Sequence, residues 1–282
     1  MTTRKTEIRR LLKLTPADML RRARGRLTLC RDLDELHRRF ADAVADEIRG
    51  HNARGEPTRL ILPVGPTGQY PFLVQTINRE RMDLRNCHFF FMDEYCDESG
   101  KAVSPKHPLS FRGSAERVFL SKLDRRCGLP PERVIFPGQD NIRRLARMIE
   151  QVGGIDTCYG GVGVHGHLAF NEPGPGVKDS EPRRVTLNDF TVTMNAIRAG
   201  VGGDLENFPR RAYTVGLKQI LAARRIRLYC RNDIPGVQWA NTVLRLALFG
   251  QPGDDYPVTW IRGLDCHVTT TEDTAARPAA PL

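Results

Sequence analysis

The stretch LILPVGPTGQYPFLVQTIN, residues 60–78, decides the fold class. It begins with a short apolar run, continues through the glycine-rich turn GPTGQYP, and ends in FLVQTIN, whose apolar residues have helical spacing. A short apolar run of this kind is typical of a strand that is buried on both faces. The stretch therefore predicts a strand, a tight loop and a helix.

The same alternation continues along the chain. Residues 87–95 (CHFFFMDEY) are predicted as a buried strand that ends in acidic residues. Further strand patterns lie at 133–137, 156–164 and 225–230, and helix patterns lie at 32–49, 108–123, 142–152 and 239–248. Strands that alternate with helices predict an α/β fold, namely a mostly parallel, Rossmann-like sheet with helices on both faces.

Two segments are expected to lie outside this regular pattern. Residues 1–26 contain nine Lys and Arg against two acidic residues, and they are predicted as a basic, partly helical N-terminal extension with a helix break near Thr15-Pro16. Residues 27–282 are predicted to form a single domain. Within it, residues 174–211 are rich in Gly, Asn, Asp and Pro, which indicates a lid-like surface excursion.

The composition narrows the class of protein. No run approaches the roughly 18 apolar residues of a membrane span, and the N-terminus lacks the apolar core of a secretory signal, so a cytoplasmic protein is expected. Seven scattered cysteines without a C-x-x-C pair indicate reduced thiols. The net charge of +10 favours an anionic partner. No aromatic residues interleave the basic ones of residues 1–26, so a solvated extension is favoured over a nucleic-acid-binding arm.

Three polar segments follow predicted strands and are expected to meet at one cleft. They are GPTGQYP (65–71), MDEY (92–95) and VHGHLAFNEP (164–173). In open parallel sheets, ligands bind beyond the carboxyl ends of the strands. The glycines of the first segment permit close approach of a phosphate to the backbone and to the following helix. The segment matches neither an ATP-binding nor a dinucleotide-binding motif.

The other two segments carry acid–base chemistry. Asp93 and Glu94 are neighbours on a strand, so only one of them can face the cleft. Burial raises the pKa of a carboxyl group into the range useful to a general base, although a helix-capping or salt-bridged acid is the alternative. His165 and His167 are separated by one glycine, and Glu172 follows His167 by five residues. This pattern is typical of a positioned acid/base with an orienting partner.

The order of these motifs resembles the glucosamine-6-phosphate deaminase family, which is related to the 6-phosphogluconolactonases. The resemblance runs from about residue 27 to about residue 275 and is strongest at MDEY (92–95) and GHLAFNEP (166–173). The AFNEP that follows the Gly-His pair is similar to the deaminases rather than to the lactonases. The resemblance implies isomerisation of an amino-sugar phosphate with loss of ammonia, without a cofactor or metal, and we expect a homo-oligomer.

The resemblance also implies roles for single residues. His167 would assist opening of the pyranose ring, oriented by Glu172, and Asp93 would move a proton between C2 and C1. The remaining substrate-binding residues would be the loop Gly65, Pro66, Thr67 and Gly68, together with Glu94, Arg198 and Lys218. Arg231 is a further candidate for the phosphate.

Two positions depart from the family pattern. His165 stands where the family has an aspartate, and Pro235 stands near the place of a phosphate-binding lysine. The first interpretation is therefore a deaminase with an altered substrate. The alternatives are a relative that binds a sugar phosphate without turnover, a lactonase-like hydrolase, and a metal-assisted enzyme in which His165 and His167, with Asp93 or Glu172, would bind zinc.

Overall fold

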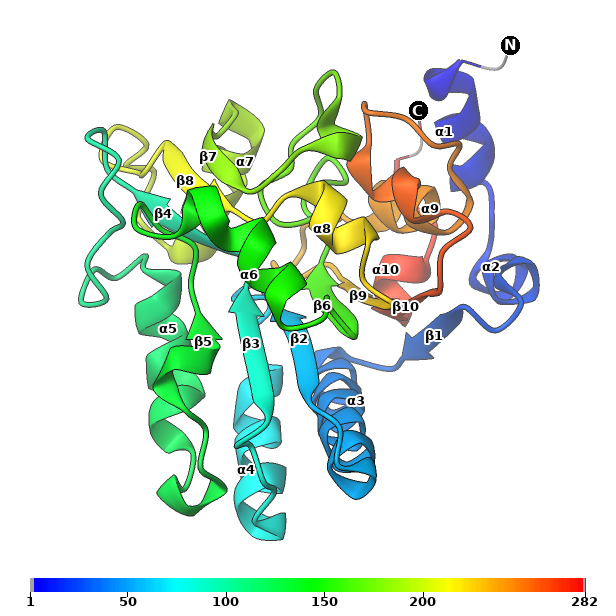
Figure 1. Ribbon diagram of the computed structural model, residues 1–282. Helices are drawn as coiled ribbons and strands as arrows, with labels where there is room; N and C mark the ends of the chain where they lie inside the picture. Colours follow the sequence, from blue (N-terminus) through cyan, green and yellow to red (C-terminus); the bar gives the residue numbers. More distant parts are fainter. Residues whose placement is uncertain (1–2, 281) are drawn as a thin grey trace.

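The computed structural model describes residues 3–280 and 282, and its centre is a seven-stranded sheet (Figure 1). Every neighbouring pair in this sheet is parallel. The α/β class predicted from the alternating pattern is confirmed. In spatial order the strands are β1 (Leu27–Cys30), β10 (Cys266–Thr271), β9 (Arg225–Cys230), β6 (Thr157–Gly161), β2 (Thr58–Leu62), β3 (Cys87–Phe91) and β5 (Val134–Ile135).

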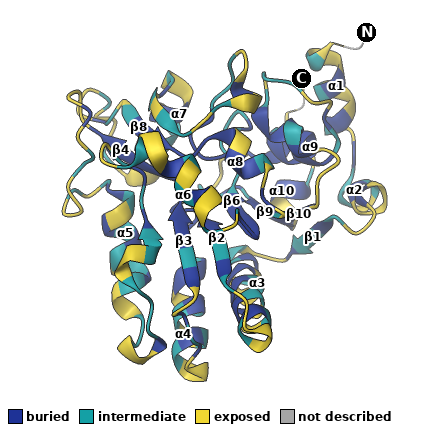
Figure 2. Ribbon diagram, in the orientation of Figure 1, coloured by how far each residue is buried: buried dark blue, intermediate teal, exposed yellow. Residues whose placement is uncertain are grey.

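Helices cover both faces of the sheet because successive strand residues point to opposite sides. Leu60 and Leu62 pack on the side of α3 (Leu33–Arg54), α4 (Gln69–Glu80) and α5 (Phe111–Val118). Ile61 packs on the side of α6 (Leu145–Gln151), α8 (Leu217–Leu221) and α9 (Asn241–Phe249). Figure 2 shows the buried strands between helices whose outer surfaces are exposed. The short helices are η1 (Leu120–Lys122), η2 (Arg125–Cys127), η3 (Pro131–Arg133), η4 (Ile142–Arg144), η5 (Val177–Asp179), η6 (Pro257–Ile261) and α10 (Glu272–Ala275).

The predicted strand 87–95 is divided at Met92, which is a correction to the sequence analysis. The backbone N–H of Met92 still donates to Leu62, but Asp93 begins a new strand, β4 (Asp93–Cys96). This strand belongs to a second, antiparallel sheet with β8 (Arg211–Thr214) and β7 (Arg183–Thr186). The acidic pair therefore lies where the chain crosses from one sheet to the other.

The excursion at 174–211 contains more regular structure than predicted. It contains η5, β7 and the helix α7 (Asp189–Ala199), and it ends as β8 begins. Val192 and Ala196 of α7 pack in a small apolar cluster with Tyr95 and Phe170. This cluster holds α7 above the carboxyl ends of the central strands.

The basic N-terminal segment is part of the folded body. The predicted break near Thr15-Pro16 is confirmed, because Thr15 and Asp18 form a capping box between α1 (Arg4–Leu12) and α2 (Pro16–Ala23). α1 lies beside α9 (Figure 1). Arg245 of α9 is fully buried and donates to the backbone carbonyls of Leu11 and Leu14 in the N-terminal segment and to that of Ala275 in α10. The expectation of a solvated extension therefore fits only the outer surface of these helices.

Two further expectations concern membranes and thiols. Among the residues described, no helix is both long and apolar enough to cross a membrane. All seven cysteines are buried and unpaired, as the sequence predicted.

Candidate functional site

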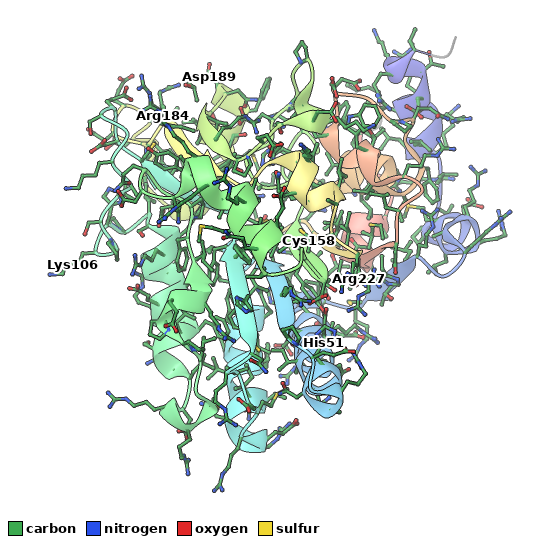
Figure 3. All side chains as sticks on the ribbon, viewed as in Figure 1. His51, Lys106, Cys158, Arg184, Asp189 and Arg227 are labelled. Carbon is green, nitrogen blue, oxygen red and sulfur yellow. The ribbon has the colours of Figure 1, made fainter. Side chains whose placement is uncertain are left out.

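A cavity of about 610 Å³ opens at the carboxyl ends of β9, β6, β2 and β3, which are adjacent in the sheet. The chain continues from β2 to β3 on one side, and β6 lies on the other, so the cavity occupies a topological switch point. Residues of all three polar segments line it, and their convergence is confirmed. Asp189 of α7 lies at the outer surface of the molecule, whereas Cys158 of β6 lies in its interior (Figure 3).

Asp93 is the acidic residue that faces the cavity. It lies at the first position of β4, its side chain is buried, and it lines the cavity wall. Burial raises the pKa of its carboxyl group to about 8, and the neighbouring charge of Glu94 adds to the effect. A carboxyl group with a pKa near neutrality can both accept and return a proton.

Glu94 points away from the cavity, as the strand alternation requires, and this corrects its predicted substrate-binding role. Its carboxylate accepts hydrogen bonds from the hydroxyl of Ser110 and from the backbone N–H groups of Tyr95, Phe111 and Arg112. Phe111 and Arg112 are the first residues of α5. Glu94 therefore caps this helix, which is the alternative that the sequence had left open.

His167 reaches the cavity from the loop after β6 and packs tightly against Gly163. A Cβ atom on Gly163 would lie 1.9 Å from Nε2 of His167, so no other residue fits beside this ring. Burial lowers the pKa of His167 well below its usual range, and the nearby His165 and Arg198 act in the same direction. The neutral imidazole is therefore favoured.

The partner of His167 is His165, not Glu172, which corrects the predicted orienting pair. The two Nδ1 atoms lie 3.1 Å apart. Nε2 of His165 lies 2.7 Å from Nδ2 and 3.1 Å from Oδ1 of Asn188, and the backbone N–H of Asn188 donates to Glu172 at 2.9 Å. The hydrogen bonds thus connect Glu172 to His167 through Asn188 and His165. Sequence reasoning missed Asn188, whose position at the N-cap of α7 depends on how residues 174–211 fold.

The loop after β2 contributes Gly65, Pro66 and Thr67 to the cavity wall. Gly68 does not line the cavity and is the N-cap residue of α4. A Cβ atom on Gly68 would lie 2.3 Å from the ring of His37, so this glycine allows the helix to begin against α3. The free N–H groups at the start of α4 follow directly after the loop, as an anion-binding loop requires.

Among the residues described, two arginines and no lysine line the cavity. Arg198 of α7 and Arg231, which follows β9, both line it, and both form ion pairs with Asp233. Burial lowers the pKa of Arg231, and its Nε has no hydrogen-bond partner among the residues described. Lys218 lies outside the cavity wall and pairs with Glu181, which corrects its predicted role. Asp233 was missed, although its place just beyond a strand end was a usable signal.

Comparisons with known proteins place this geometry in context. No family model matches the chain. A glucosamine-6-phosphate deaminase of Porphyromonas gingivalis is 34% identical over 211 residues, which are 72% of this chain and 76% of the relative. A glucosamine-6-phosphate deaminase of Caenorhabditis elegans is 29% identical over 210 residues, which are 72% of this chain and 74% of the relative.

Solved structures agree with the fold. A monomeric glucosamine-6-phosphate deaminase superposes with a TM-score of 0.77 and 25% identity, covering 90% of this chain and 100% of that one. A 6-phosphogluconolactonase from Thermotoga maritima superposes with a TM-score of 0.59 and 18% identity, covering 87% of this chain and 98% of that one. The lactonase shares the fold of this chain.

Proposed function

Because the chain belongs to the glucosamine-6-phosphate deaminase family, we propose that it converts an amino-sugar phosphate of the glucosamine 6-phosphate type into a ketose phosphate and ammonia. One observation carries the proposal. A single cavity holds a buried carboxyl group with a pKa near 8, a neutral imidazole, and two arginines beside a glycine-containing loop. These are the groups that an aldose–ketose isomerisation of an anionic sugar needs.

In the first step His167 assists opening of the pyranose ring. A proton leaves the hydroxyl group on C1 and one is returned to the ring oxygen, so that the C1–O5 bond breaks and an open-chain aldehyde forms. Nε2 of His167 lies over Gly163 at the cavity wall, on the ring edge opposite the contact with His165. Neutral imidazole carries both a donor and an acceptor nitrogen, which suits a transfer between two oxygens.

In the second step ionised Asp93 removes the proton from C2 and returns it to C1. The electron pair of the C2–H bond forms the C1–C2 double bond of an enolamine as the C1 carbonyl oxygen takes a proton from water, and return of the C2 proton to C1 leaves a protonated imine at C2. Water adds to this imine and ammonia departs, which gives the ketose. C1 and C2 are adjacent, so one carboxylate oxygen serves both carbons. Because the pKa of Asp93 is about 8, its carboxyl group can lose and regain a proton near neutral pH.

Arg231 and Arg198, together with the loop from Gly65 to Thr67, bind the phosphate. Arg231 supports this assignment because its guanidinium group is buried, faces the cavity and has an unused Nε donor. Arginine binds phosphate through two parallel N–H donors, so it can replace a lysine at this place with a different geometry. This replacement agrees with a substrate whose anionic group lies differently from the usual one.

The test measures ammonia release from hexosamine phosphates and from the same sugars without phosphate. We expect turnover only with the phosphates, and a loss of at least about 1,000-fold in kcat for Asp93→Asn, which removes the acid–base group. Arg231→Gln should raise KM far more than it lowers kcat. The matched control, Arg117→Gln on the exposed surface of α5, should change neither value. A full set of hexosamine phosphates without ammonia or ketose formation would refute the proposal.

We also infer the setting of the reaction. All seven thiols are free and buried, which supports the reducing cytoplasm as the place of action. The homo-oligomer expected from the sequence stays a prediction, and one solved relative is a monomer. Light scattering of the purified protein decides between these states.

A further inference from the structure

His165, His167 and Glu172 bring three metal-ligand side chains together beside the cavity. The two Nδ1 atoms face each other at 3.1 Å, and one ligand atom from each of the three residues lies within 4.8 Å of the others. Oε1 of Glu172 is buried and has no hydrogen-bond partner among the residues described. A buried carboxylate oxygen without a donor is unfavourable unless a cation or proton lies beside it.

We propose that His165, His167 and Glu172 form a binding site for a divalent transition metal of the zinc class. Two imidazoles and one carboxylate are a common zinc ligand set, with a fourth position left to water. Hard cations such as magnesium prefer oxygen ligands, so they are not expected here. The site goes beyond the proposed deaminase reaction, which needs no metal.

The spacing of the two imidazoles already fits such an ion. With Zn–N bonds of about 2.05 Å, nitrogen atoms 3.1 Å apart subtend an angle of about 98° at the metal. This angle is close to tetrahedral, so the two nitrogens already have a suitable separation, and zinc binding requires the rings to turn so that both Nδ1 lone pairs face the ion instead of each other. Tetrahedral bonds of about 2.1 Å separate ligand atoms by about 3.4 Å, so the carboxylate oxygen of Glu172, which lies within 4.8 Å, has to approach by at most about 1.4 Å.

The surroundings hold the ligands as metal sites require. A ligating histidine usually donates its second N–H to a carbonyl or carboxylate, which fixes the ring. Nε2 of His165 lies 2.7 Å from Nδ2 and 3.1 Å from Oδ1 of Asn188, so metal binding at Nδ1 requires Nε2 to donate its proton to Oδ1. Asn188 also donates its backbone N–H to Glu172. One residue thus supports two of the three ligands. All three ligands are partly exposed, so an ion can enter without unfolding the domain.

The site would lie between the cavity and the lid. Asn188 is the N-cap residue of α7, and Phe190 of α7 lies edge-on to His165 with ring centroids 6.2 Å apart. A metal bound at Nδ1 of His167 leaves Nε2 at the cavity wall. Metal binding would therefore fix the orientation of this ring and tie it to the start of α7.

Direct binding to tag-free, full-length protein tests the proposal. After removal of metals with a chelator, the protein is titrated with ZnCl₂ by calorimetry, and bound zinc is measured by mass spectrometry after desalting. We expect one equivalent per chain. His165→Ala and Glu172→Gln should each weaken binding by more than about 100-fold, which exceeds the loss caused by removing a supporting contact. His88→Ala, at the amino-terminal end of β3, is the matched histidine control and should bind as the unmodified protein does.

Three results would overturn the site. They are less than half an equivalent of bound zinc, unchanged affinity in both ligand variants, and an equal loss in His88→Ala. Because His165→Ala can disturb the fold of the lid, cobalt provides a second measurement on the unmodified protein. Its visible spectrum should show a four-coordinate ion, and a six-coordinate spectrum would also refute the proposal. No substrate is used, so failure here leaves the deaminase proposal intact, and an inactive enzyme leaves the metal result intact.

Discussion

The raised pKa of Asp93 predicts that replacing this residue changes the stability of the protein in a pH-dependent way. The pKa of Asp93 in the folded protein is about 8, whereas an aspartate in an unfolded chain titrates near about 3.9. Between these values the unfolded chain has lost the proton that the folded protein still holds. The free energy of unfolding therefore falls as the pH rises through this window, and it stays level above about pH 8.

In this pH window the folded and unfolded states differ by one bound proton, so the free energy of unfolding falls by about 1.4 kcal/mol per pH unit. Asparagine has nearly the same shape as aspartate and has no proton to lose. The free energy of unfolding of Asp93→Asn should therefore exceed that of the unmodified protein by an amount that grows with pH. Between pH 5 and 7 this excess should grow by about 3 kcal/mol, and above about pH 8 it should stop growing.

Urea unfolding of both proteins at intervals from pH 5 to pH 9 measures this difference. The control is Asp97→Asn. The pKa of Asp97 is lowered, mainly because the hydroxyl group of Ser99 donates to its carboxylate, so its stability difference should be constant over the same range. If the Asp93→Asn difference were also constant between pH 5 and 8, Asp93 would be ionised at neutral pH. The physical basis for its proton transfer would then be wrong.

Three further predictions concern single contacts. Gly163→Ala should displace the ring of His167, because the added Cβ would lie 1.9 Å from Nε2, and should lower the kcat of ammonia release by about 100-fold. An unchanged kcat would show that the ring has another position available. Glu94→Ala should lower the free energy of unfolding, measured with urea, by about 2–4 kcal/mol, since four donors lose their acceptor. A loss below about 0.5 kcal/mol would contradict the capping role. Arg245→Met should lower the free energy of unfolding by a similar amount, because the buried carbonyls of Leu11, Leu14 and Ala275 lose their donor. An unchanged melting temperature would refute this prediction.

The sheet could be predicted from the sequence because its signals are local. The apolar runs at β2, β3, β5 and β9 are each followed by a helical pattern, and this alternation implies a parallel sheet. The division of residues 87–95 at Met92 could not be predicted. No glycine or proline interrupts residues 87–95, and the chain changes sheets because β4 pairs with the distant β8.

In the candidate site, too, the residues with local signals could be predicted and those placed by distant contacts could not. Asp93 and His167 could be identified as cavity residues because both follow strand ends, and strand ends share one edge of a parallel sheet. Which of Asp93 and Glu94 faces the cavity depends on the position of α5, whose first N–H groups bind Glu94. Arg231 lines the cavity and Lys218 does not, which depends on how tightly the chain turns after β8 and β9 rather than on residue type.

His165 gives the start of α7 a part in the chemistry of His167. An aspartate at this place can only accept a hydrogen bond, so it would hold the proton of His167 on Nδ1. His165 can accept or donate across the 3.1 Å contact, and its choice depends on which atom of Asn188 meets its other nitrogen. Asn188 caps α7 through the N–H of Thr191. The tautomer of His167, and with it the direction of proton transfer at Nε2, therefore depends on where the lid helix begins.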